Sequence, residues 1–450
     1  MALHHFDTDS TIIAPATASG GAVVVVRISG PEAIAIVDSI FRGRTKLTDA
    51  KGYTLHYGDI VYDSGEPLDD VIVSLFRAPH SYTGEDSVEV SLHGSEFIVS
   101  EFLRLCIERG ATMATPGEFT RRAFLSGKMD LSRAEAVADI IAADSRWSHN
   151  VATTQIRGSY SERLAAMRES LLRLCSLLEL ELDFSEEDVE FANRDELRKM
   201  LKNIALEVAQ LKSSFALGNV LKNGVTVAIV GEPNVGKSTL LNSLIEDDRA
   251  MVSDIAGTTR DTIEATTTIN GIRYRFIDTA GLRNTDDKLE QMGIDRTYRA
   301  IENAQIILHI AAADNPVFEN IVTLPHQKYI QIINKIDKAT STKDTANTPL
   351  CISAKYNIGI DALRTLLGEC VDTSSVNSSS VVVTNMRHYA ALEKASESIQ
   401  MAIMAMENNL PSDLLSEDIR QTLHHLGEIT GDITSDDILH SIFSKFCIGK

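Results

Sequence analysis

The feature that most constrains the fold is the string Gly231-Glu-Pro-Asn-Val-Gly-Lys-Ser238, which matches the pattern G-x-x-x-x-G-K-[ST]. It follows an apolar run at Val225–Val230 that predicts a buried strand, and a helix is expected after Lys237. Glycines let backbone N–H groups turn toward phosphates, and a helix N-terminus favours their negative charge. The string therefore predicts a phosphate-binding loop in a doubly wound parallel α/β sheet.

This loop supplies the first set of predicted nucleotide contacts. Lys237 would neutralise the β- and γ-phosphates and is a candidate catalytic residue, and the Ser238 hydroxyl would ligate Mg²⁺. The bare pattern also occurs by chance in loops, but a strand before it and a helix after it argue against chance here. The predicted contacts in this loop are Asn234, Val235, Gly236, Lys237, Ser238 and Thr239.

Three further motifs follow in order, each at the end of a predicted strand: D-T-A-G, N-K-I-D and S-A-K. The Asp278 carboxylate can hold the Mg²⁺ shell. Asp337 can accept hydrogens from guanine N1 and its 2-amino group, which adenine does not offer in that arrangement. The motifs together predict a GTP site. Their predicted contacts are Asp278, Thr279, Ala280, Gly281, Asn334, Lys335, Asp337, Ser353, Ala354 and Lys355.

The segment between the first two motifs contains G-T-T-R-D from Gly257, and Thr259 is expected to complete the Mg²⁺ shell. Many related GTPases orient the attacking water with a Gln after D-T-A-G, but Leu282 stands there and cannot do so. Glu290, in a polar loop, is the candidate replacement. From the residues alone, a solvated surface acid is the more ordinary interpretation of Glu290.

The rest of the chain divides into an α+β region and a helical region. Strands are expected at 22–28, 71–76 and 87–92 and a helix at 96–109, which is typical of an α+β domain. An S-x-x-E capping box at Ser132 and Glu135 predicts a helix start. Leu171, Leu174, Leu178 and Leu182 predict one buried helix face. Gly218 is expected to end a helix over 195–215, and more helices are expected at 387–408, 413–427 and 435–443.

These segments predict three domains. The expected α+β domain spans 1–127, an all-α domain combines 128–218 with 376–450, and an inserted P-loop (Ras-like) α/β domain spans 219–375. The α/β domain is predicted to be an insertion because we expect the last helices to pack back on the helices of 131–215. A Ser-rich run over 372–380 predicts a linker.

Composition narrows the classes of function. The net charge of −20 argues against a protein that binds nucleic acid through its own phosphate contacts. The five cysteines form no C-x-x-C pair, which argues against a disulfide framework or a zinc site and favours a reducing cytoplasm. The chain has no apolar run of about 18 residues and no recognisable secretion signal, so we expect no membrane association.

The whole chain resembles the MnmE (TrmE) family of tRNA-modification GTPases. Besides the GTPase motifs, the resemblance rests on six N-terminal and central strings and the tail: S-Y-T-G-E-D from Ser81, H-G at His93, P-G-E-F from Pro116, R-A-F-L from Arg122, Lys128 with Asp130-Leu131, A-E-A from Ala134, and F-C-I-G-K from Phe446.

The resemblance implies the biological role. Such a protein is a homodimer that works with the flavoprotein MnmG (GidA), as a heterotetramer or larger complex. Together they install a carboxymethylaminomethyl-type group at carbon 5 of the wobble uridine of certain tRNAs. The N-terminal domain would bind a 5-formyl- or methylene-tetrahydrofolate, and FAD would enter only through the partner. The acidic charge then fits a division of labour in which the partner holds most of the tRNA.

The resemblance also implies residue roles. The matching folate contacts are Arg27, Glu89, Lys128 and Lys450. K⁺ would take the place of an arginine finger, with ligands at Asn234, Ser253, Ile255 and Thr258. The switch segment would contact the nucleotide through Ser253, Asp254, Ile255, Ala256, Gly257, Thr258 and Thr259. Glu290 matches the water-positioning acid. Cys447 is either a nucleophile or a small packed thiol beside the folate pocket.

Two other functions compete with this one. A regulatory switch for ribosome assembly, as in Era or EngA, would share the GTPase motifs, but the sequence has neither a G-x-x-G RNA-binding module after them nor a second P-loop. A folate sensor without chemistry of its own would bind folate and leave tRNA nucleosides unchanged when deleted.

Overall fold

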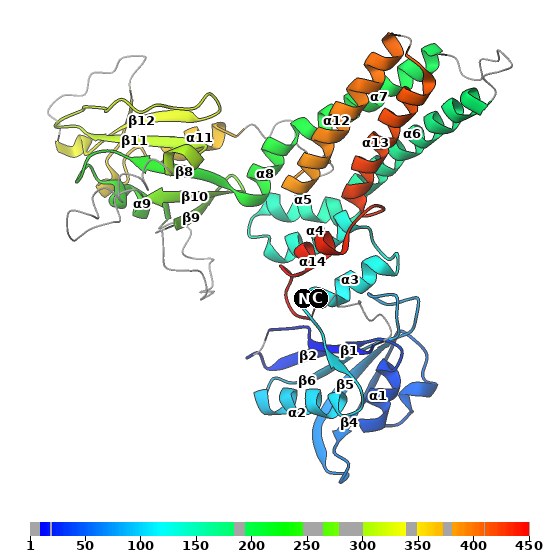
Figure 1. The fold of residues 1–450 in the computed structure, drawn as a ribbon. Helices are drawn as coiled ribbons and strands as arrows, with labels where there is room; N and C mark the ends of the chain where they lie inside the picture. The colour runs from blue at the N-terminus through cyan, green and yellow to red at the C-terminus, as the bar shows by residue number, and fades with distance from the viewer. Residues whose placement is uncertain are drawn as a thin grey trace, which may run out of the picture. The chain divides into compact units, whose positions relative to one another are not determined.

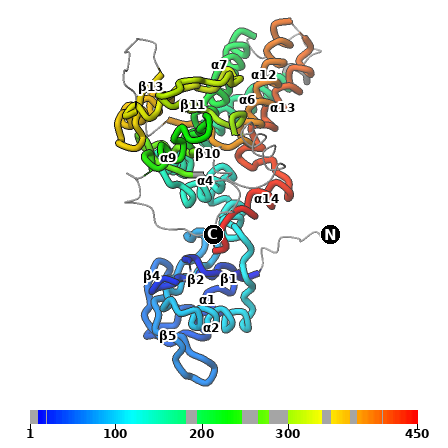
Figure 2. Tube along the Cα trace, turned by 90° about the vertical axis from the view of Figure 1, so that its left-hand side faces the viewer, coloured from blue at the N-terminus to red at the C-terminus, as the bar shows by residue number. Residues whose placement is uncertain are grey.

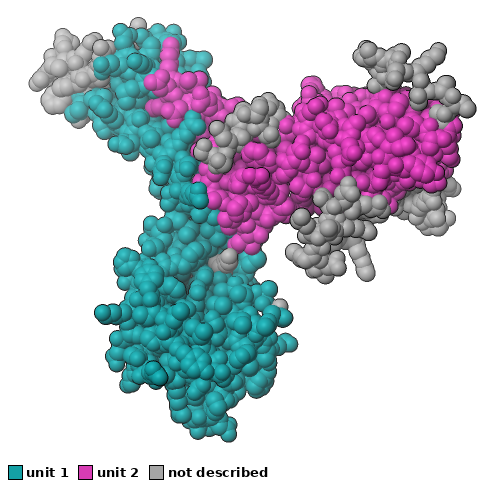
Figure 3. Space-filling view, turned by 180° about the vertical axis from the view of Figure 1, so that it is seen from behind, with its two compact units in different colours: residues 1–138, 156–201, 397–450 teal, residues 139–155, 202–396 magenta. Residues whose placement is uncertain are grey.

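The computed structural model describes residues 10–18, 20–183, 194–245, 264–278, 300–338, 349–371, 380–408 and 410–449. The chain forms two compact units (Figure 3). Unit 1 comprises 1–138, 156–201 and 397–450, and unit 2 comprises 139–155 and 202–396. Among the described residues, every helix is too short or too polar to cross a bilayer.

The N-terminal part of unit 1 is an α+β fold built on one sheet (Figure 1). Helices α1 (Ala33–Ile40) and α2 (Glu96–Ile107) contribute to its core with Ile36, Val37, Phe102 and Cys106. The sheet order is β3-β4-β5-β6-β2-β1-β7. The strands are β1 (Ile12–Pro15), β2 (Val23–Ser29), β3 (Phe41–Gly43), β4 (Thr54–Val61), β5 (Pro67–Phe76), β6 (Ser87–His93) and β7 (Thr112–Met113). All three strands expected from the sequence are confirmed.

The helical segments begin with α3 (Glu118–Leu125). The longest described helix, α6 (Ser159–Asp183), packs against α13 (Ser412–Thr430). Leu171, Leu174 and Leu178 on α6 are fully buried, as their spacing predicts. The side chain of Leu182 lies outside the described residues. The other described helices of these segments are α4 (Leu131–Ala142), α5 (Arg146–Ile156), α7 (Arg194–Ser213), α8 (Phe215–Asn223), α12 (Met386–Glu407) and α14 (Asp436–Phe443).

Two local expectations were wrong. Helix α4 begins at Leu131, and Asp130 caps it, because its Oδ1 accepts from Arg133 N at 3.0 Å. Ser132 donates to that same oxygen at 2.7 Å and is no cap. Gly218 lies inside α8 rather than at a helix end. A Cβ at Gly218 would lie 2.1 Å from the carbonyl oxygen of Val383, so close backbone approach accounts for this glycine.

Unit 2 contains the second sheet, in the order β13-β12-β11-β8-β10-β9 (Figure 1). All pairs are parallel except β10 with β9, as expected of a doubly wound sheet with an antiparallel edge. Its strands are β8 (Val225–Val230), β9 (Glu264–Ile269), β10 (Ile272–Asp278), β11 (Ile306–Ala312), β12 (Lys328–Asn334) and β13 (Leu350–Cys351). Helices α9 (Lys237–Ile245) and α11 (Ile360–Glu369) bury Leu240, Leu244, Leu363 and Leu367 against them.

The segment after α14 returns to the N-terminal part of unit 1 (Figure 2). Phe443 and Phe446 join Leu131 in a small apolar core. The N–H of Gly117 donates to the carbonyl of Cys447 at 3.4 Å. A Cβ at Gly449 would lie 2.0 Å from the carbonyl oxygen of Pro15, so the tail backbone lies directly against the end of β1. Residues from both ends of the chain therefore build this region.

Candidate functional site

The phosphate-binding loop predicted from the sequence lies between β8 and α9. Three of its residues adopt positive φ: Gly231 at 147°, Asn234 at 63° and Gly236 at 102°. A Cβ at Gly231 would lie 2.1 Å from the carbonyl oxygen of Ile310, so this close approach to β11 requires glycine. Left-handed backbone of this kind forms the concave nests that bind phosphate.

Lys237 opens α9 and is 6% exposed. Its Nζ donates to the carbonyl oxygens of Gly231 and Glu232 at 2.5 and 2.8 Å, which hold the ammonium group over the loop. Ser238 and Thr239 follow on the first turn of α9 and are exposed. The first turn of α9 therefore combines a cation held at the loop with two exposed hydroxyl groups.

Asn334, the last residue of β12, connects the loop to a second segment. Its side chain is buried, and Nδ2 donates to the carbonyl of Val235 at 2.9 Å while Oδ1 accepts from the N–H of Ala354 at 3.0 Å. Ser243 on α9 donates to the carbonyl of Ala354 at 2.7 Å. A Cβ at Gly236 would lie 2.4 Å from Asn334 Nδ2. The structure thus brings three of the motifs into contact, as the prediction of a single GTP site requires.

Asp337 lies three residues beyond Asn334, and Ser353 Oγ donates to its Oδ1 at 2.6 Å. This hydrogen bond is the main cause that lowers the pKa of Asp337 below its usual value, and Lys338 and Lys355 add to the effect. The carboxylate is therefore anionic, and only an acceptor, throughout the neutral range. Lys335, at φ 65°, donates through Nζ to the carbonyl of Asn234, which ties this motif to the phosphate loop.

Several predicted nucleotide contacts lie outside the described residues. Asp278 ends β10 as expected. In the strand register it pairs with Ile229 of β8, two residues before the phosphate loop. The predicted residues that the structure does not describe are Ser253, Asp254, Ile255, Ala256, Gly257, Thr258, Thr259, Thr279, Ala280, Gly281, Glu290 and Lys450, together with the side chain of Asp278.

A second polar site lies in the N-terminal part of unit 1. Arg27 on β2 faces Glu89 on β6 in the strand register, and its Nε donates to Glu89 Oε1 at 2.9 Å. The guanidinium carbon lies 5.1 Å from the ring centre of Tyr82 and 5.7 Å from that of Phe119. Sequence reasoning gave neither aromatic ring a role, although both belong to the strings S-Y-T-G-E-D and P-G-E-F.

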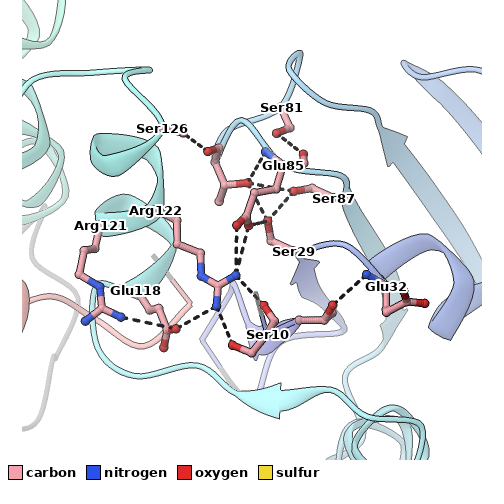
Figure 4. Close-up of polar contacts among 12 residues, drawn as sticks. Ser10, Ser29, Glu32, Ser81, Glu85, Ser87, Glu118, Arg121, Arg122 and Ser126 are labelled. Atoms are coloured by element: carbon pink, nitrogen blue, oxygen red, sulfur yellow. Dashed lines mark hydrogen bonds and ion pairs between the residues drawn. The ribbon is translucent and has the colours of Figure 1, made fainter. Parts of the chain in front are cut away.

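Arg122 contacts Glu85, in the loop after β5 (Figure 4), and Tyr82 belongs to the same loop by sequence. Arg122 is 3% exposed and donates to the carbonyl of Ser10 at 2.7 Å, to Glu85 at 3.2 Å and to Glu118 at 3.3 Å. Glu85 also accepts from the hydroxyl of Ser29, on β2, at 2.8 Å. Because a buried guanidinium is stable only when it is paired, this network holds α3, β2 and the loop in one arrangement.

Two more predicted residues lie near this pair. Lys128 is exposed, and its Nζ donates to the carbonyl of Pro79 at 2.9 Å. Cys447 is exposed, which does not fit the packed thiol considered from the sequence. Its segment lies against the end of β1, the strand in which Ala14 pairs with Arg27. The structure therefore brings Arg27 and Glu89 into contact, and Lys128 and Cys447 into the same region.

Comparisons with known proteins cover nearly the whole chain. The model described as "GTP-binding protein TrmE N-terminus" matches residues 11–128, and "MnmE helical domain" matches residues 131–447. The tRNA modification GTPase MnmE of Flavobacterium johnsoniae is 47% identical, with 98% of this chain and 99% of that protein covered. The Bacteroides fragilis protein of the same name is 46% identical over the same shares.

Solved structures match over smaller portions. Aquifex aeolicus Era bound to GDP and aluminium fluoride is 26% identical over 39% of this chain and 67% of that chain, with a TM-score of 0.27. The T. maritima FeoB G domain is 23% identical over 32% of this chain and 98% of its own, with a TM-score of 0.24. From its full-length relatives and the two matched models, the chain belongs to the MnmE (TrmE) family.

Proposed function

We propose that this chain is a GTPase that acts in the modification of the wobble uridine of tRNA. The observation that carries the GTPase part is the set of hydrogen bonds through which Asn334 joins the phosphate loop to the segment of Ser353 and Ala354. The tRNA part is supported by the name of relatives that align over nearly the full length of both chains.

The residues of the site fit GTP with Mg²⁺. Lys237, held over the loop by two carbonyl groups, would transfer its hydrogen bonds to the β- and γ-phosphates. The exposed Ser238 hydroxyl, with Thr259 and Asp278, would hold Mg²⁺, which neutralises charge on the phosphates when bound. Glu290 would position the attacking water, because Leu282 has no polar group for that task.

The Asp337 carboxylate would select guanine. Replacing Asp337 by Asn removes the carboxylate that would accept hydrogen bonds from guanine N1–H and the 2-amino group. The new amide N–H could instead donate a hydrogen bond to the second carbonyl of xanthine. We expect GTP affinity to fall by on the order of 10² to 10⁴-fold and the affinity for xanthosine triphosphate to rise. Displacement of a fluorescent nucleotide measures both. Asp361→Asn, on the exposed face of α11, is the control and should change neither affinity.

K⁺ would stabilise the charge that develops during hydrolysis, held by Asn234 and loop oxygens of Ser253, Ile255 and Thr258. Asn234 has φ 63°, so Asn234→Gly removes its side chain without adding backbone strain. We expect this variant to bind GTP normally and to lose the stimulation of hydrolysis by K⁺ relative to Na⁺, by about 10-fold or more. Undiminished stimulation by K⁺ would exclude the side chain as a ligand.

The second site would bind a reduced folate that carries a one-carbon unit at the formyl or methylene level. Arg27 and Lys128, with Lys450, supply cations for carboxylates, Glu89 supplies an acceptor for a pterin edge, and Tyr82 and Phe119 supply aromatic faces. A separate proposal is that the exposed Cys447 thiol acts as a nucleophile. Full tRNA modification by a Cys447→Ser variant would contradict it.

Removing the guanidinium should weaken folate binding. We expect Arg27→Met to raise the Kd for 5-formyltetrahydrofolate by roughly 10- to 100-fold, since it removes hydrogen bonds from a charged donor. Isothermal titration measures the Kd. Arg109→Met removes the ion pair with Asp63 and the hydrogen bond to the Leu105 carbonyl, neither of which involves a predicted folate contact, so this variant is the matched control and should bind folate as the wild type does. Equal Kd values for the two variants would place the folate elsewhere.

The proposed assembly is a cytoplasmic homodimer with the flavoprotein MnmG (GidA), which would bring FAD and bind most of the tRNA. The net charge of −20 supports the assignment of most tRNA binding to the partner, because an acidic chain attracts few phosphates by itself. The division into 1–127, 128–218 with 376–450, and 219–375 then assigns folate to the first part, GTP to the last, and the connection between them to the helices.

Mass spectrometry of tRNA nucleosides from cells that lack this chain tests the biological role. We expect the carbon-5 substituent of the wobble uridine to disappear, and the wild-type chain but not Glu290→Ala to restore it. An unchanged wobble uridine would leave the GTPase assignment in place and would favour a switch in ribosome assembly of the Era or EngA kind.

A further inference from the structure

Helix α13 carries a cluster of metal-ligating side chains that none of the proposed activities uses. His424 and His425 are followed one turn later by Glu428. Their donor atoms all lie within 4.8 Å of one another. His424 Nε2 lies 3.6 Å from Glu428 Oε1, and His425 Nδ1 lies 3.5 Å from Glu428 Oε2. We propose that this cluster binds one divalent transition-metal ion of the Zn²⁺ class. Its donors are histidine and carboxylate groups, so the absence of paired cysteines does not exclude it.

The spacing of the donors suits such an ion. Zn²⁺ takes imidazole nitrogens and carboxylate oxygens at about 2.0–2.2 Å, so two ligands on a tetrahedral ion lie about 3.3–3.5 Å apart. Both distances to Glu428 are close to this value. The side chain of His424 is 47% exposed, and its ring centre lies 5.5 Å from that of His425. Two imidazoles and one carboxylate are the donor set of zinc sites that keep a fourth position open to water.

The state of His425 is the second observation. Its side chain is 16% exposed, and its Nδ1 is buried without a hydrogen-bond partner among the described residues. Glu428 lies within ion-pair distance of this nitrogen but makes no hydrogen bond to it. A buried ring nitrogen left in this way costs free energy, and a metal ion held jointly with Glu428 would satisfy it.

The position on the helix favours a cation for an independent reason. The cluster lies in the last turns of α13, which ends at Thr430, with Gly431 as its C-cap. The negative end of the helix dipole disfavours the carboxylate of Glu428 there and attracts a positive ion. Arg168 on α6 does not take that place, because it donates to the carbonyl of Leu423 at 2.8 Å and pairs with Asp432 at 3.2 Å.

Titration of metal-stripped full-length protein with Zn²⁺, in the presence of excess Mg²⁺ and GDP, tests the proposal. We expect one equivalent to bind and the thermal midpoint to rise, since an ion that binds the folded state stabilises it. His424→Gln and His425→Gln should each remove both effects. His440→Gln, an exposed histidine of α14 outside the cluster, is the matched control and should retain them. Co²⁺ should give the visible absorption of a tetrahedral site in the wild type and in the control only.

Two outcomes would overturn the proposal. Absence of saturable Zn²⁺ binding below about 100 µM would leave the cluster as ion pairs within one helix. Binding that survives both cluster variants would assign the ion to another part of the chain, such as the His4-His5 pair. The circular dichroism of each variant without metal shows whether it is folded. His424→Gln changes a half-exposed side chain, so it keeps the test valid if His425→Gln fails to fold.

Discussion

The nucleotide site depends on one buried amide group. Asn334 donates to the phosphate loop at Val235 and accepts from Ala354, so a single side chain sets the distance between the segments that would contact phosphate and base. Aspartate could not donate there, and alanine would leave two backbone groups without partners. The same amide explains Gly236, because any Cβ at that position would lie 2.4 Å from its nitrogen. The loop and the base-selecting segment therefore tolerate little independent change.

Much of the fold could be predicted because its signals are local. The strands of the second sheet are rich in apolar and β-branched residues. Strands β10 and β12 end at the first residue of a motif, and β8 ends one residue before the phosphate loop. Because parallel strands place their carboxyl ends at one edge, the order of motifs was enough to predict that they would gather there. In the N-terminal sheet three strands were also predictable. Family resemblance implied that Arg27 and Glu89 are folate contacts, but only the structure shows that the two residues pair.

The features that could not be predicted depend on contacts between distant residues. Asp130 and Ser132 are both good capping residues, and only the position of α4 decides between them. Gly218 resembles a helix terminator by sequence, but it is required by the carbonyl of Val383, far along the chain. Tyr82 and Phe119 acquire their places around Arg27 through the network of Arg122, whose partners come from three separate segments.

The tail against β1 has a consequence for the order of assembly during translation. Gly449 and Pro15 are more than four hundred positions apart, so their contact closes a very long loop and forms late. At typical rates of about 5–20 residues per second, the N-terminal sheet leaves the ribosome tens of seconds before the segment that covers it. The nascent domain spends that interval with the end of β1 uncovered. A premature stop codon between the N-terminal sheet and the tail would therefore release a sheet whose strands are paired but whose β1 end lacks its contact with Gly449.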